Sequence, residues 1–129
     1  MIASNIDFVH RFISSLVFTD TIETIILILV IRFVLRNRTI RIRDMVFAGL
    51  YASFSTISYV WFVFPYLFAW PGSTALICAE AFAFVVEAVF YRFVLKLDWK
   101  IVFFISFVCN LASYLLGPFL RAHGIWIYW

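Results

Sequence analysis

The chain has 129 residues, of which 66% are hydrophobic and 13% are charged, and its mean hydropathy is +1.06. This composition excludes an ordinary water-soluble domain and is typical of an integral membrane protein. The net charge of +3 is small, and the basic residues lie beside apolar segments. We therefore expect a lipid bilayer around the chain and no nucleic acid among its partners.

A transmembrane helix needs about 20 apolar residues, because each residue advances the helix by about 1.5 Å. In chain order, the sequence offers four such spans, at about 12–35, 44–64, 73–95 and 100–120. The sequence therefore predicts an all-α integral membrane protein, in which residues 1–129 form a single domain, a four-helix transmembrane bundle. The side chains expected to cap the helices that follow the connections are Asp44, Ser73 and Asp98.

The basic residues predict the orientation of the chain. Eight of the ten flank the first and third connections, namely Arg32, Arg36, Arg38, Arg41, Arg43, Arg92, Lys96 and Lys100. By the positive-inside rule, both connections are cytoplasmic, which places the N-terminus and the C-terminus outside. An aromatic belt at the outer interface agrees with this, with Trp61, Trp70, Trp126 and Trp129. The expected location is the plasma membrane of a prokaryote.

The two halves of the chain resemble each other. Arg-Phe-Val-Leu at 32–35 recurs at 92–95, and at the same offset Asp20 aligns with Glu80. The second and fourth spans also carry matching faces, on which Ser53 and Thr56 align with Asn110 and Ser113. We therefore predict two tandem helical hairpins in parallel orientation, related by a pseudo-two-fold axis along the membrane normal.

Four of the seven acidic residues lie inside predicted spans, with no Lys or Arg at their depth: Asp20, Glu23, Glu80 and Glu87. A carboxylate in hydrocarbon is costly, so such a group normally faces a bundle interior, a watery cavity, a cation or a partner. By helical rise, Glu87 lies about 12 Å and Glu23 about 18 Å above the cytoplasmic ends of their spans. We predict ion or proton binding by the four acids, chiefly by Glu23 and Glu87.

Polar residues of the second and fourth spans are expected to face these acids: Ser53, Thr56, Asn110 and Ser113. Like charges so close in a low dielectric repel, so one or more of the carboxyls should carry a proton at neutral pH. Two structural alternatives stay open. The polar groups can serve as interhelical contacts worth about 0.6 kcal/mol each, and Arg11 or Arg121 can reach Asp20 or Glu80 to form an ion pair.

Other chemistry has weaker support. Asp7, His10 and His123 all fall on the outer side and could hold a transition metal if the two ends of the chain meet, or they are ordinary tail residues. The sequence contains no HExxH, GxSxG or phosphate-binding loop, and it identifies no cofactor. The arginine-rich first connection is a topology determinant or, alternatively, a site for anionic headgroups. We therefore expect no catalytic activity of the chain itself.

Two functions fit these features best. The favoured one is an accessory subunit of a larger membrane complex, of respiratory, redox or monooxygenase type, whose acids meet groups on partner helices. The alternative is a small homo-oligomeric transporter or channel, coupled to protons or cations through the intramembrane carboxylates. A membrane enzyme acting on lipid or quinone comes third, since no catalytic constellation supports it. The expected partners are thus other membrane subunits or copies of the chain itself.

Overall fold

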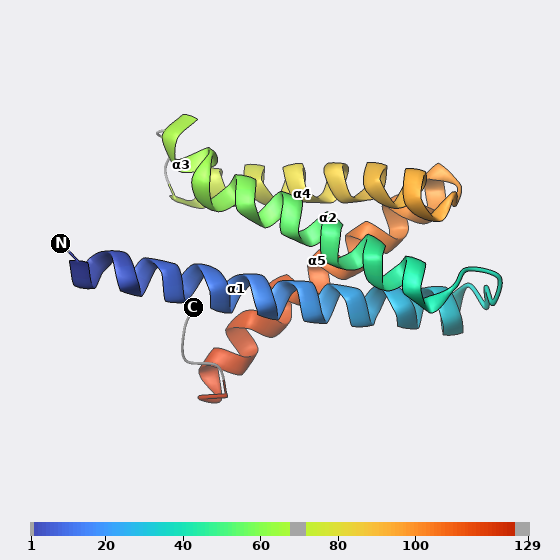
Figure 1. The fold of residues 1–129 in the computed structure, drawn as a ribbon, viewed down its shortest axis with the longest axis horizontal. Helices are drawn as coiled ribbons and strands as arrows, with labels where there is room; N and C mark the ends of the chain where they lie inside the picture. The colour runs from blue at the N-terminus through green and yellow to red at the C-terminus, as the bar shows by residue number, and fades with distance from the viewer. Residues whose placement is uncertain (1, 68–71, 126–129) are drawn as a thin grey trace.

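The computed structural model describes residues 2–67 and 72–125, and within these ranges every regular element is helical. The prediction of an all-α chain is therefore confirmed. The elements, shown in Figure 1, are α1 (Ile2–Leu29), which continues into one turn of π-helix, η1 (Val30–Val34), then α2 (Ile42–Phe62), the short α3 (Phe64–Leu67), α4 (Gly72–Leu95) and α5 (Trp99–Ala122).

The helices follow the predicted spans, with differences at their ends. α1 begins ten residues before the predicted span, because its more polar N-terminal segment continues the helix beyond the apolar stretch. α2 and α5 are each long and apolar enough to cross a membrane. The cap prediction at Asp44 is wrong: α2 begins after Arg41, and Asp44 lies in its first turn, 3.0 Å from the Arg41 guanidinium.

Asp98 does occupy the position before α5, but its side chain makes no capping hydrogen bond. The side chain of Ser73 and the belt residues Trp70, Trp126 and Trp129 lie outside the described part of the chain.

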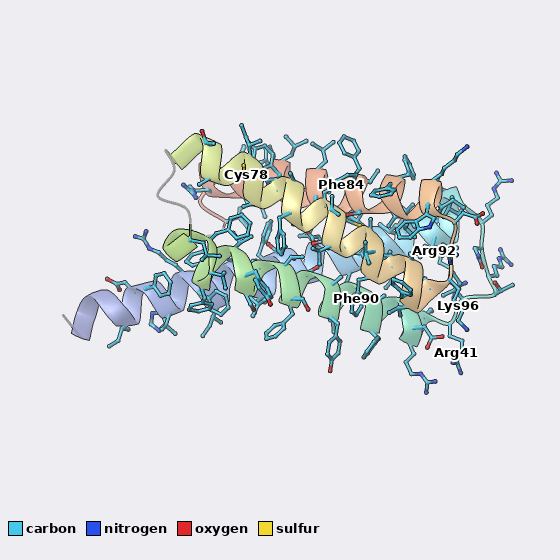
Figure 2. The ribbon with its side chains drawn as sticks, turned by 90° about the horizontal axis from the view of Figure 1, so that it is seen from above. Arg41, Cys78, Phe84, Phe90, Arg92 and Lys96 are labelled. Atoms are coloured by element: carbon cyan, nitrogen blue, oxygen red, sulfur yellow. The ribbon has the colours of Figure 1, made fainter. Side chains whose placement is uncertain are left out.

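The long helices form a bundle in which α1 contacts α2, α2 contacts α4, α4 contacts α5, and α5 returns to α1. α1 and α4 run in one direction and α2 and α5 in the other, with α5 crossing obliquely (Figure 1). The connections at residues 35–41 and 96–98 consequently lie together. We call this the basic end, because Arg41, Arg92 and Lys96 gather there, whereas Cys78 lies toward the opposite end (Figure 2).

Both connections at the basic end begin in the same way. Arg36 follows Leu35, the residue after η1, and Lys96 follows Leu95, the last residue of α4. Both adopt left-handed backbone conformations, with φ of 52° and 54°. A left-handed residue is a common way to end a helix, although glycine is the usual choice. The Arg32 guanidinium fixes the first connection by donating to the carbonyl oxygens of Asn37 and Ile40 at 2.8 and 2.7 Å.

The half of the bundle nearer the basic end is filled by apolar side chains. They are fully buried: Leu27, Ile31, Met45, Tyr91, Val102 and Ile105. Close helix contact supports this core, because a Cβ atom placed on Gly49 would lie 3.0 Å from the Thr24 Cα atom, which leaves no room for a side chain. Small residues allow such approach between helices where packing rather than the hydrophobic effect drives association.

Candidate functional site: a buried carboxyl pair beside a cavity

Glu23 of α1 lies in the middle of the bundle, with 1% of its surface exposed. Its Oε2 atom accepts a hydrogen bond from the Ser53 hydroxyl of α2 at 2.6 Å, and its Oε1 atom accepts one from the Ser113 hydroxyl of α5 at 2.7 Å. The Cys109 thiol also approaches the Glu23 backbone carbonyl, at 3.5 Å. One carboxyl group thus joins three helices.

Glu87 of α4 is the second fully buried carboxyl, also with 1% exposure. Its Oε1 atom lies 3.1 Å from the Thr56 hydroxyl of α2, and its Oε2 atom accepts a short hydrogen bond from the Asn110 side-chain amide of α5. The Ser106 hydroxyl approaches the same Oε2 atom at 3.4 Å. Glu87 therefore joins α4 to the two helices that Glu23 also contacts.

All four predicted supporting residues contact this carboxyl pair, as we call Glu23 and Glu87. Their helical spacing explains why: Ser53 and Thr56 are three residues apart on α2, as are Asn110 and Ser113 on α5, so each pair shares a face. Ser106 extends the α5 face by one further turn. It was not among the predicted supporting residues, although its position four residues before Asn110 places it on the same helix face.

The pair is close enough for the two carboxyl charges to interact, and Glu23 also interacts with the charges of Glu80 and Asp20. Glu80 and Asp20 thus lie near enough to Glu23 for their charges to act on it. Among the residues described, no basic side chain forms an ion pair with any of them, since the ion pairs present join Asp44 to Arg41 and Arg43 at the basic end.

The hydroxyl partners can accommodate a proton on either carboxyl group. Thr56 has one hydroxyl hydrogen, yet its oxygen lies near Glu87 Oε1 and also 3.1 Å from the carbonyl oxygen of Ser53. Ser113 is placed in the same way, 3.0 Å from the Asn110 carbonyl oxygen as well as beside Glu23. A hydroxyl both donates and accepts, so each can receive a carboxyl proton while donating to its own helix. When the carboxyl group is ionised, the hydroxyl can rotate and donate its hydrogen to the carboxylate instead.

A cavity of about 560 Å³ adjoins the pair. Glu23, Glu87, Thr56, Asn110 and Ser113 line its inner part. Trp61, from the C-terminal end of α2, and Arg121, from that of α5, line the part farthest from the basic end. The cavity therefore runs from the middle of the bundle toward the end opposite the basic connections, and its size is that of small-molecule sites.

The two remaining acids lie nearer that opposite end. Glu80 of α4 is half-buried and lines the cavity, whereas Asp20 of α1 is half-buried with one carboxylate oxygen, Oδ1, enclosed and without a hydrogen-bond partner. Arg121 lines the same cavity as Glu80, but the structure shows no ion pair between them. The ion pairs considered for Arg11 and Arg121 are thus not formed in the described part of the chain.

The structure does not bring the weak metal candidates together. Asp7 and His10 are exposed on α1, and His123 is exposed after α5, where its ring lies 4.4 Å from that of Phe119. Within residues 2–67 and 72–125, no three His, Cys, Asp or Glu side chains are grouped as a metal site requires. Oxygen donors at the carboxyl pair are of the kind that hard cations prefer.

Comparison with protein-family models, with curated proteins and with solved structures finds no match for this chain. Function is therefore inferred from the carboxyl pair, its hydroxyl partners and the adjoining cavity. These features can hold and release a proton or a cation.

Proposed function

We propose that the chain is a four-span integral membrane protein that binds protons or cations at Glu23 and Glu87 and exchanges them through the cavity, as a small proton- or cation-coupled transporter. The observation that carries this proposal is the pair of fully buried carboxyls that line a cavity without any basic partner in the described chain. In lipid, such groups mark ion and proton pathways by default.

The arrangement of α1 and α4 supports four spans. Both lie in the bundle between α2 and α5, and each buries one carboxyl, Glu23 or Glu87, while exposing apolar side chains. The exposed residues include Ile13, Val17, Ile25 and Leu29 on α1, and Ile77, Val85, Val89 and Phe93 on α4. A protein with polar groups inside and apolar groups outside fits a bilayer rather than water. The basic end is then cytoplasmic and the cavity faces outward.

The backbone supports the proposed duplication of a helical hairpin. Arg36 and Lys96 lie 60 positions apart, the offset of the repeated Arg-Phe-Val-Leu, and adopt the same left-handed conformation. Each carboxyl also takes one partner from each of the two polar faces, Ser53 and Ser113 for Glu23, and Thr56 and Asn110 for Glu87. Parallel repeats around a central site are a known transporter design.

The mechanism follows from the asymmetry of the bundle. The cavity gives the carboxyl pair access to the outer side, while the apolar core separates it from the basic end. An ionised carboxyl cannot cross such a layer without great cost, whereas a protonated or cation-paired one can. The apolar core would therefore rearrange to open the carboxyl pair toward the basic end only when Glu23 and Glu87 hold a proton or a cation. The π-helical turn η1, at the C-terminal end of α1, is a place where such movement can begin.

An accessory subunit is the second candidate. Acids without a basic partner had suggested contact with another chain, but Glu23 and Glu87 are satisfied inside this one. The observation that still favours a subunit is the aromatic surface exposed on α2 and α5, including Phe47, Tyr51, Phe54 and Phe107. Purification from native membranes in mild detergent separates the two: large partners at a fixed ratio favour the subunit and count against an autonomous transporter.

Proteoliposomes test the transporter directly. With a cation supplied on the opposite side, the purified chain should collapse an imposed pH gradient by exchange. Glu23→Gln and Glu87→Gln should abolish this flux because glutamine binds neither a proton nor a cation as a carboxylate does. Asp98→Asn is the matched control, since this acid precedes α5 at the basic end and its side chain makes no cap bond. Equal flux for wild type and both glutamine variants would overturn the proposal.

A further inference from the structure

We infer that the cavity takes a lipophilic organic cation, one with a single positive charge on an aromatic or branched apolar body, and that this cation arrives from the bilayer through a groove between α4 and α5. The inference rests on the proposed function and names its substrate class. It is carried by the size and lining of the cavity, by the charges around it, and by a second cavity that shares three of its residues.

The size of the central cavity points to an organic ligand. Its volume of about 560 Å³ exceeds what a bare or partly hydrated ion requires, and it falls in the range of sites for organic molecules. Apolar side chains form much of the wall above the carboxyl pair, including Ile57, Val60, Ala79, Ala83 and Leu115. An inorganic ion gains nothing from such a wall, whereas an apolar body is removed from water by it.

The charges of the cavity select a cation. Glu23, Glu80 and Glu87 all line it, and Arg121 near the far end is the basic residue among its lining side chains. Trp61 and Tyr114 also line the cavity, and their ring faces can attract a positive charge that is poorly hydrated. The presence of carboxyl groups and aromatic rings in one cavity matches a ligand that combines a positive charge with an apolar body.

A second cavity, of about 330 Å³, lies between α4 and α5. Ile77 and Phe107, with 69% and 55% of their surfaces exposed, are among the side chains that line it, so it faces the apolar outside of the bundle. Glu80, Asn110 and Tyr114 line both cavities. These three residues therefore form the boundary between the outer groove and the central cavity.

Glu80 is placed to act at this boundary. It is half-buried, in contrast to the fully buried pair, and it faces the groove as well as the cavity. A cation lying in the groove would meet Glu80 first and could then pass to Glu87, whose partner Asn110 also lines both spaces. Phe84, packed at 5.5 Å against Phe103, borders the groove toward the basic end. This position gives Glu80 a role distinct from that of the pair.

Equilibrium binding of tetraphenylphosphonium to the purified full-length chain tests the ligand class. We expect saturable binding that Glu87→Gln weakens by about thirtyfold or more, as loss of one member of a buried charge pair typically does. Asp98→Asn should bind like wild type. Absence of saturable binding, or equal affinity of wild type and Glu87→Gln, would overturn the inference. If Glu87-dependent proton flux persists in that case, the proposed function stands while its organic substrate does not.

A rate measurement tests the route through the groove. Ala81 is exposed and lines only the outer groove, so Ala81→Phe should obstruct access and slow phosphonium association in liposomes by about tenfold, with the equilibrium Kd unchanged. Val89→Phe is the matched control, because Val89 is exposed on the same helix and lines neither cavity. An unchanged Kd shows that the variant is folded. Equal association rates for Ala81→Phe and wild type would exclude this route.

Discussion

Replacement of Glu87 by glutamine distinguishes a protonated carboxyl from an ionised one. An amide has nearly the shape and hydrogen-bonding pattern of a neutral carboxyl group. In Glu87→Gln, the side-chain oxygen can accept from Asn110, and the NH₂ group can donate to the Thr56 hydroxyl, which then donates to its own helix. If Glu87 carries a proton at neutral pH, the glutamine variant should therefore unfold with nearly the wild-type free energy.

Alanine at the same position sets the scale. Glu87→Ala removes contacts with Thr56, Asn110 and Ser106, and interhelical polar contacts in membranes average about 0.6 kcal/mol each, so about 2 kcal/mol should be lost. The void left at a site with 1% exposure adds to this loss where it stays empty. We thus expect a difference of about 2 kcal/mol or more between the alanine and glutamine variants.

Reversible unfolding in mixed micelles, followed by far-ultraviolet circular dichroism, measures these free energies. Asp98→Asn controls for the loss of one acid elsewhere in the chain. A glutamine variant as unstable as the alanine variant would refute the reasoning, because it would show that the native carboxyl is charged and that its charge is stabilised by a bound cation or a partner.

Five further substitutions, one of them a control, probe the bundle. Ser53→Ala should lower the free energy of unfolding by about 0.6 kcal/mol through loss of the bond to Glu23. Ser55→Ala should leave that free energy unchanged, because the exposed Ser55 hydroxyl bonds only to Tyr51 of its own helix; equal effects in the same assay would contradict the contact. Gly49→Leu should separate α1 from α2 and lower the free energy of unfolding by about 1–3 kcal/mol. Retained stability in this variant would refute the close approach of the two helices. Tyr91→Phe should change that free energy by less than about 1 kcal/mol, since the Cys109 thiol is only a weak partner for the buried hydroxyl, and a clear loss would show a stronger partner. Arg32→Ala should speed amide hydrogen exchange at residues 37–40, whereas unchanged exchange would show that the guanidinium does not hold this connection.

The sequence was sufficient to predict the helices and most of the polar cluster. In an apolar chain, acids and hydroxyls stand out, and their spacing shows which of them share a helix face, as Ser53 and Thr56 do. Helix ends were less predictable. Asp44 was predicted to cap α2, but the helix begins earlier, directly after Arg41. Asp44 therefore lies in its first turn.

The pairing of particular side chains could not be read from spacing. Glu23 meets Ser113 across 90 residues of chain, and this contact depends on the oblique crossing of α5. The same crossing determines which side chains line the central cavity and the groove, so neither space could be predicted from the periodicity of the individual helices. The role of Ser106 was missed for a related reason, since a serine in an apolar helix commonly bonds to its own backbone.

Infrared spectroscopy of the reconstituted chain tests the central claim, that Glu23 and Glu87 form a protonatable pair in contact with the central cavity. We predict a band from protonated carboxyl groups at neutral pH that is reduced in Glu23→Gln or Glu87→Gln, is unchanged in Asp98→Asn, and shifts promptly in D₂O because the cavity reaches the pair. A spectrum in which neither glutamine variant alters this band, or in which the band does not exchange, would contradict the account.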